Sequence, residues 1–112
     1  SNTETTTKAK TYNVGICQLV QHAALDAASQ GFMDAIDDAM GKGTVKYDYQ
    51  NASADAATCT TIVNGFVASN VDLILANATL PLQTAAAATG DIPILGTSVT
   101  NYQVALDMPH MG

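Results

Sequence analysis

Short apolar runs alternate along the chain with longer segments whose apolar residues recur at helical spacing. Most of the runs end in small polar residues. In chain order, the runs and the helical segments between them cover roughly 12–20, 24–40, 45–49, 54–69, 71–76, 79–88 and 92–95. Regular alternation of this kind is typical of a parallel sheet whose strands are joined by crossover helices.

The pattern within each run predicts its place in the sheet. The first run is almost continuously apolar, as expected for a central strand buried on both faces. The run Val45–Tyr49 alternates apolar and polar residues, which is typical of a half-exposed edge strand. Right-handed crossovers then favour the strand order 2-1-3-4. The predicted fold class is α/β: a three-layer, four-stranded parallel sheet of order 2-1-3-4 flanked by helices, a truncated Rossmann-like lobe.

Local signals mark the ends of the predicted helices. Gly41 and Gly43 are expected to stop the first helix, because glycine tolerates a left-handed cap. Ser53 is expected to cap the second helix. Pro81 suits the first turn of the third helix, where a missing amide costs nothing.

Composition narrows the classes of ligand. The chain has 112 residues, 47% of them hydrophobic, which is enough for one domain with a core. Its net charge is −6, and its four basic residues are all lysines. This charge argues against a nucleic-acid partner. Without arginine, an anionic ligand has to be held by backbone amides, hydroxyls, side-chain amides or lysine.

The chain divides into two parts. Residues 1–11 are polar and threonine-rich and have no apolar period, so we expect a disordered leader. Residues 12–112 are expected to form one domain. No run approaches the roughly 18 apolar residues of a membrane span.

Motifs for catalysis are absent from the sequence. There is no phosphate-binding loop, and no glycine fingerprint for a dinucleotide follows the first strand. Cys17 suggests one alternative, a small phosphocysteine-type carrier or enzyme with this residue as nucleophile, although the segment after it lacks the donors of an anion cradle. Cys17 and Cys59 fit two buried thiols better than a disulfide, and no metal-ligand spacing is present. We therefore expect no catalytic residue, no metal and no cofactor.

Short polar side chains follow two strands that the predicted order makes neighbours. They are Asn77, Thr79, Thr97, Ser98 and Thr100. Together with the amides that open the third helix, they are suited to holding a carboxylate. The same residue types also favour ordinary turns and helix caps, and their position alone does not decide between the two. For His22, too, the sequence leaves two interpretations open, a ligand contact and a local hydrogen bond at a helix start.

Three segments resemble a known family. They read V-G-I-C-Q-L-V-Q-H-A-A-L-D-A-A-x-Q-G-F at 14–32, Y-Q-N-A-S-A-D-A-A-T at 49–58, and V-D-L-I-L-A-N-A-T-L-P-L-Q-T-A-A-A-A-T-G-D-I-P-I-L-G-T-S-V-T at 71–100. This pattern resembles ABC-transporter substrate-binding proteins of the tryptophan/tyrosine-binding family, and it covers nearly everything after residue 11.

The resemblance implies a two-lobed fold similar to type I periplasmic binding proteins, with a small solute, often an aromatic amino acid, held between the lobes. It implies a membrane permease as partner, and a location outside the cell, as a lipoprotein tethered to a Gram-positive surface, or in a periplasm. The ligand contacts that it implies for the first lobe are Gln18, Leu19, Val20, Gln21, His22, Asn77, Ala78, Thr79, Gly96, Thr97, Ser98 and Val99.

The length of the chain matches only the first part of lobe one in that family. Residues 12–112 are therefore interpreted as an N-terminal lobe fragment of a solute-binding protein. We expect an exposed edge on the last strand, a homodimer through that edge, and weak solute binding. A stand-alone dimeric interaction domain is the further alternative.

Overall fold

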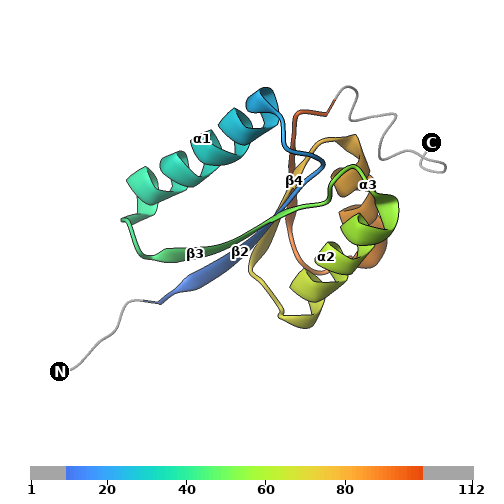
Figure 1. The fold of residues 1–112 in the computed structure, drawn as a ribbon. Helices are drawn as coiled ribbons and strands as arrows, with labels where there is room; N and C mark the ends of the chain where they lie inside the picture. The colour runs from blue at the N-terminus through green and yellow to red at the C-terminus, as the bar shows by residue number, and fades with distance from the viewer. Residues whose placement is uncertain (1–9, 100–112) are drawn as a thin grey trace.

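Strands and helices alternate through residues 10–99, the part of the chain that the computed structural model describes (Figure 1). In chain order the elements are β2 (Tyr12–Gln18), α1 (Ala23–Met40), β3 (Val45–Asn51), α2 (Ala56–Ala68), β4 (Leu73–Asn77), α3 (Thr79–Ala88) and β5 (Ile94–Thr97). The predicted alternation is confirmed.

The strands form a 4-stranded sheet of order β3-β2-β4-β5, and every pairing is parallel. Counted along the chain as first to fourth, these strands have the order 2-1-3-4 that the sequence predicted. The central strand β2 is buried from Val14 to Gln18, whereas β3 lies at an edge and is mostly exposed. The fold class, an α/β domain with a flanked parallel sheet, is therefore confirmed.

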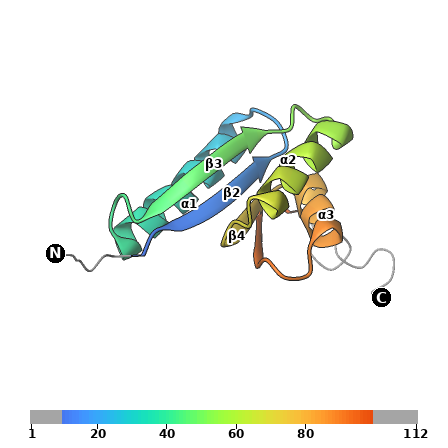
Figure 2. The ribbon, with the colours of Figure 1, turned by 90° about the horizontal axis from the view of Figure 1, so that it is seen from below.

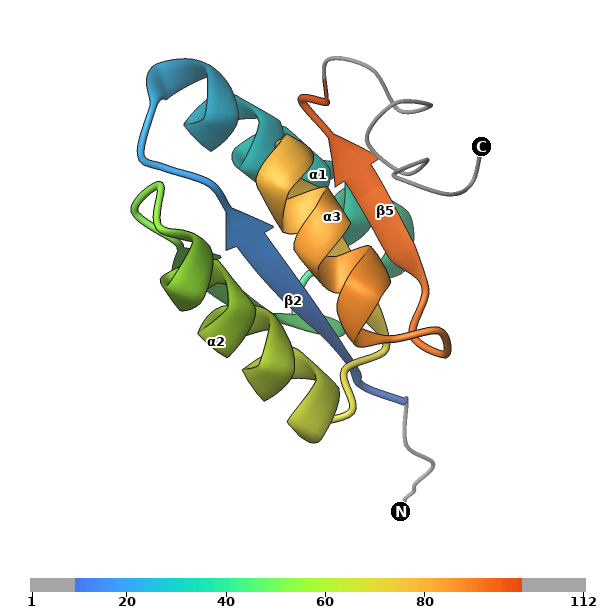
Figure 3. The same ribbon diagram turned by 90° about the vertical axis from the view of Figure 1, so that its right-hand side faces the viewer.

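Helices cover both faces of the sheet. In Figure 3, α2 and α3 lie side by side over one face, and Figure 2 shows α1 on the other. The α2 face is closely packed at Gly15, where an added Cβ would lie 2.5 Å from Cγ of Phe66. On the α1 face, Val14 and Ile16 pack against Phe32. Because side chains alternate along β2, one strand supplies both cores.

The predicted cap of the second helix and the predicted end of the first strand are wrong. Ser53 does not cap the second helix; its φ is 54°, and its backbone N–H donates to Asn51 Oδ1 at 2.9 Å. The cap is Asp55, whose carboxylate accepts from Thr58 N at 2.8 Å. The first strand ends at Gln18 instead of residue 20, because Leu19 and Val20 form a bend. The predicted cap was close in sequence, but an aspartate two residues later has the extended backbone that a cap needs.

The polar ends of β4 and β5 belong to the strands themselves. β4 extends to Asn77 and β5 to Thr97, one and two residues beyond the predicted ends at 76 and 95. Pairing therefore fixes the positions of these polar residues relative to the rest of the sheet. Within residues 10–99, no helix has the length and apolar character needed to span a bilayer.

Candidate functional site

Polar residues form one row across the carboxyl ends of the strands. Gln18 of β2 pairs with Asn51 of β3 on one side and with Asn77 of β4 on the other. Asn77 pairs in turn with Thr97 of β5. In open parallel sheets, ligands bind beyond this end, near the point where the strand order reverses. Here that point lies between β2 and β4.

Backbone hydrogen bonds connect the three segments predicted to contact a ligand. Leu19 N donates to Asn77 O at 3.2 Å, and Ala78 N donates to Thr97 O at 2.9 Å. The structure thus brings residues 18–22, 77–79 and 96–99 together, as the resemblance implied. That these residues touch a ligand stays a prediction, and Thr100 lies outside the described residues.

The predicted residues differ in how far they reach the surface. Gln21, His22 and Ser98 are exposed. Gln18, Asn77 and Ala78 are buried. The half-buried members are Leu19, Val20, Thr79, Gly96, Thr97 and Val99. A ligand at this edge of the sheet would meet the exposed and half-buried residues first, and the buried ones lie beneath them.

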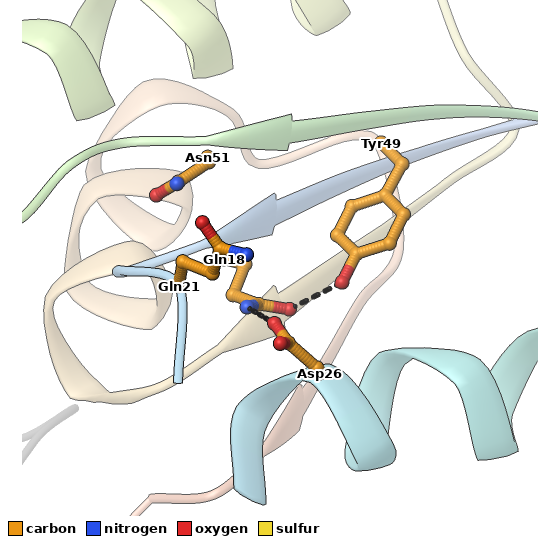
Figure 4. Close-up of a pocket in the computed structure, with 5 residues that line it drawn as sticks. All are labelled: Gln18, Gln21, Asp26, Tyr49 and Asn51. Carbon is orange, nitrogen blue, oxygen red and sulfur yellow. Dashed lines mark hydrogen bonds between the residues drawn. The ribbon is translucent and has the colours of Figure 1, made fainter. Parts of the chain in front are cut away.

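A hollow of about 320 Å³ opens beside this row between β2, β3 and the start of α1 (Figure 4). It is lined by Gln18, Gln21, Asp26, Tyr49 and Asn51. Sequence reasoning missed Asp26, Tyr49 and Asn51. The signals available were an acidic residue in the first helical turn and the alternation that puts Tyr49 on the same face of its strand as Tyr47.

Gln18 is the hub of the polar network in Figure 4. Its Oε1 accepts hydrogen bonds from Ser29 Oγ at 2.8 Å and from Tyr49 OH at 2.7 Å. Its Nε2 donates to Val20 O at 2.9 Å and to Asp26 Oδ1 at 2.6 Å. One buried amide therefore fixes the bend after β2, the start of α1 and an aromatic ring of β3.

Asn77 extends the network to β4. Its Nδ2 donates to Ser29 Oγ and to Leu25 O, both at 2.8 Å, and approaches Gln18 Oε1 at 3.4 Å. Asn77 and Ser29 are fully buried. Among the described residues, Asn77 Oδ1 is the buried side-chain oxygen without a hydrogen-bond partner. The side chain of Asn77 thus ties α1 to the switch point and keeps one acceptor unsatisfied.

The helix starts at this end of the sheet differ in their caps. His22 caps α1, because its Nδ1 accepts from Ala24 N at 3.1 Å, so this histidine makes the local bond considered from the sequence. In α3, by contrast, Ala78 is the N-cap and provides no side-chain hydrogen bond. Of the helices within residues 10–99, α3 alone starts without a side-chain cap. Its first-turn amides carry the partial positive charge of a helix N-terminus.

The charges near the row are negative. Lys10, Lys42 and Lys46 lie near the amino ends of the strands, away from the row. Asp26 is half-buried in the hollow, and Asp55 lies at the start of α2. Hydrogen bonds from the hydroxyl and the backbone amide of Thr58 hold the pKa of Asp55 below its ordinary value. Among residues 10–99, a cationic group at the row would therefore meet carboxylates, whereas an anionic group would meet amides and hydroxyls.

Cys17 does not have the setting of a nucleophile. Its side chain is fully buried, with Sγ 3.6 Å from Sγ of Cys59. Burial, with a smaller contribution from Cys59, raises the pKa of the Cys17 thiol far above its ordinary value. Since the thiolate is the reactive form, this environment does not favour the phosphocysteine alternative. The described residues also contain no group of three or more side chains suited to a metal ion.

Comparison with known proteins decides the family. A family model described as ABC transporter substrate binding protein matches residues 13–106. The chain belongs to this family. A tyrosine-binding protein from Clostridioides difficile is 45% identical over 94 residues, which is 82% of this chain and 27% of the relative. The family suggested by the sequence is therefore confirmed.

Solved structures of family relatives have the same fold. A ligand-free, open structure of a Clostridium difficile substrate-binding protein with adhesive properties is 41% identical, with a TM-score of 0.81 over 84% of this chain and 32% of that chain. A Streptococcus pneumonia ABC domain in complex with L-Trp is 30% identical, with a TM-score of 0.81 over 86% of this chain and 33% of that chain. The chain thus spans about a third or less of the length of these relatives.

Proposed function

We propose that this chain forms part of one lobe of the solute-binding component of an ABC importer, and that its row of strand ends binds an aromatic amino acid. The observation that carries the proposal is the register, which aligns Gln18, Asn77 and Thr97 at the switch point of the sheet. The names of the relatives, one a tyrosine-binding protein and one a domain in complex with L-Trp, support the class of solute.

The distribution of charge suits a zwitterion. Asp26 places a carboxylate in the hollow, where an ammonium group would be stabilised. The uncapped start of α3 offers backbone amides, and Thr79 adds a half-buried hydroxyl beside them. Amides at a helix start bind carboxylates without arginine. An amino acid carries both of the charged groups that these two places would hold.

Tyr49 supports an aromatic side chain on the solute. Its hydroxyl is fixed by the 2.7 Å bond to Gln18, while 42% of the residue remains exposed at the hollow. A held ring with an exposed face is a platform on which another ring packs. Leu19 and Val20, both half-buried, add apolar surface directly after the end of β2.

The location and partners follow from the proposed role. A solute-binding component works outside the cell or in the periplasm and hands its solute to a membrane permease, and we propose both for the protein to which this chain belongs. In Gram-positive cells we propose that it is tethered as a lipoprotein. This lobe provides only part of the wall around a solute, so we expect the 112-residue chain to bind an amino acid with a Kd of roughly 1 mM.

The test is a ligand series measured by saturation-transfer NMR on the 112-residue chain. L-Tryptophan is compared with tryptamine, which lacks the carboxylate, with indole-3-propionate, which lacks the amine, and with L-alanine, which lacks the ring. We expect saturable binding of L-tryptophan. The affinity of each analogue should be roughly tenfold lower, since each lacks one charged hydrogen-bonding group or the ring. Equal binding of L-tryptophan and tryptamine, or of L-tryptophan and L-alanine, would contradict the proposal.

A matched pair of variants tests the role of α3. Thr79→Val removes the hydroxyl at the start of the helix, and Thr60→Val makes the same change on the exposed surface of α2. We expect Thr79→Val to weaken L-tryptophan binding about tenfold and Thr60→Val to leave it unchanged. Equal affinities of the two variants would remove Thr79 from the proposed site.

The homodimer stays a prediction. β5 lies at the edge of the described sheet, and its Leu95 is 48% exposed. An exposed apolar edge strand favours pairing with another chain. Light scattering on the wild-type chain and on Leu95→Lys tests it: a dimer that the variant abolishes is expected, and a monomeric wild-type chain would refute it.

A further inference from the structure

The two cysteines of the chain meet inside the core between the sheet and α2. Cys17 is on the central strand β2, and Cys59 is in the first turn of α2, 42 positions later. Both side chains are fully buried, and their Sγ atoms lie 3.6 Å apart as free thiols. No other cysteine exists in the chain to compete for either of them.

A disulfide between Cys17 and Cys59 requires the two sulfurs to approach further than in the reduced structure. A disulfide has an S–S length of roughly 2.05 Å, so the sulfurs must close by about 1.5 Å. β2 is held on both sides, because Cys17 pairs with Gln50 and with Ala76. Cys59 is on a helix whose first three residues are exposed, and the first turn of such a helix moves more easily than a central strand.

We propose that Cys17 and Cys59 are a disulfide-forming pair that covalently joins α2 to the central strand when the chain meets a disulfide oxidant. The proposal rests on the separation of the two Sγ atoms and their common burial, and it is independent of the proposed function. It assigns the pair a role in stability, separate from solute binding.

The chemistry is thiol–disulfide exchange with an external disulfide, such as oxidised glutathione. One cysteine attacks the external disulfide as its thiolate and releases one molecule of thiol, which takes up the proton that the cysteine lost. The second cysteine then attacks the mixed disulfide and releases the second thiol. Two protein thiols thus lose two electrons and two protons, and one external disulfide gains them.

Burial makes the first attack slow. The external disulfide reaches neither sulfur while α2 is packed on the sheet, so oxidation has to pass through an opening of α2. The oxidised chain should then be more stable, because the crosslink removes conformational freedom from the unfolded chain. For a loop of this length we expect the melting temperature to rise by roughly 20 °C.

The experiment incubates the 112-residue chain with oxidised glutathione, with and without low urea, and follows the intact mass and free thiols over time. We expect a monomer that has lost two hydrogen atoms, faster oxidation in urea, the higher melting temperature, and full reversal by dithiothreitol. Cys17→Ala and Cys59→Ala serve as controls, and each should end as a mixed disulfide with glutathione.

Three outcomes would overturn the proposal. One is a wild-type product with a glutathione on each cysteine and no internal crosslink. Another is a disulfide that forms only between two chains. The third is an oxidised monomer that melts below the reduced one, since the crosslink would then strain the core.

Discussion

The most informative substitution is Gln18→Leu, because Gln18 holds four elements together through one side chain. Leucine has a similar size but makes none of the hydrogen bonds. Tyr49 is 42% exposed and Asp26 is half-buried, so water replaces the bonds that they lose. Ser29 is fully buried, and its hydroxyl would lose the acceptor that it has at 2.8 Å.

The expected cost follows from that one orphaned donor. A buried polar group without a partner costs about 1–3 kcal/mol, so we expect Gln18→Leu to lower the free energy of unfolding by about 2 kcal/mol. Ser29→Ala in the same background removes the orphaned hydroxyl. The variant that carries both Gln18→Leu and Ser29→Ala should therefore be about 1 kcal/mol more stable than expected from adding the two single effects.

Urea unfolding followed by circular dichroism measures all three variants. Gln50→Leu is the matched control, since Gln50 is exposed and its side chain bonds to Asp48 at 2.6 Å on the surface. Its effect should stay within about 0.5 kcal/mol. If Gln18→Leu costs no more than Gln50→Leu, or if the effects of Gln18→Leu and Ser29→Ala simply add, the orphaned Ser29 hydroxyl is not the source of the cost.

Three further predictions concern the frame around the site. Gly15→Ala should lower the free energy of unfolding by about 2 kcal/mol, because its Cβ would meet the Phe66 ring at 2.5 Å. Gly31→Ala, whose Cβ in α1 would meet nothing within 4 Å, should raise the free energy of unfolding by about 0.5 kcal/mol. Equal urea midpoints for the Gly15→Ala and Gly31→Ala variants would contradict the close approach of Phe66 to Gly15. Ala78→Gly should stabilise the chain by about 1 kcal/mol in the same assay, because the φ of 117° at Ala78 strains any residue except glycine. A loss of stability in this variant would show that Ala78 is not strained. The pKa of Asp55 is lowered on folding, so its contribution is present above the ordinary carboxyl pKa of about 4 and is lost as pH falls through the folded value. Asp55→Asn should therefore reduce the loss of melting temperature between neutral and acidic pH, and an unchanged acid slope would contradict that cause.

The sequence predicted the fold well because its signals are local and periodic. Continuous apolar residues placed β2 at the centre, and alternation placed Val45–Tyr49 at an edge; the structure confirms both. Helix caps were harder, because the choice between Ser53 and Asp55 depends on backbone angles that the sequence does not reveal. The Cys17–Cys59 pair was expected to be buried, and it is, but the 3.6 Å contact needed the packing of α2.

The candidate site was predictable only in part. The positions of the strand ends followed from topology, so the three segments around Gln18, Asn77 and Thr97 were found together. The hollow was missed, because Asp26 and Tyr49 reach Gln18 from a helix and from another strand. Such long-range contacts depend on register and side-chain direction, which periodicity does not give.

Solute binding at the carboxyl ends of β2, β4 and β5 can be observed residue by residue in solution. The decisive experiment records ¹⁵N–¹H correlation spectra of the chain during a titration with L-tryptophan. We expect saturable shifts concentrated in residues 18–22, 77–79 and 96–99, together with Asp26 and Tyr49 of the hollow. The opposite end of the sheet provides the internal control, because a hollow of about 380 Å³ there is lined by residues that include Tyr12, Met40 and Leu73. Shifts concentrated in that hollow, or no saturable shift anywhere, would rule out a binding site at the carboxyl ends of the strands.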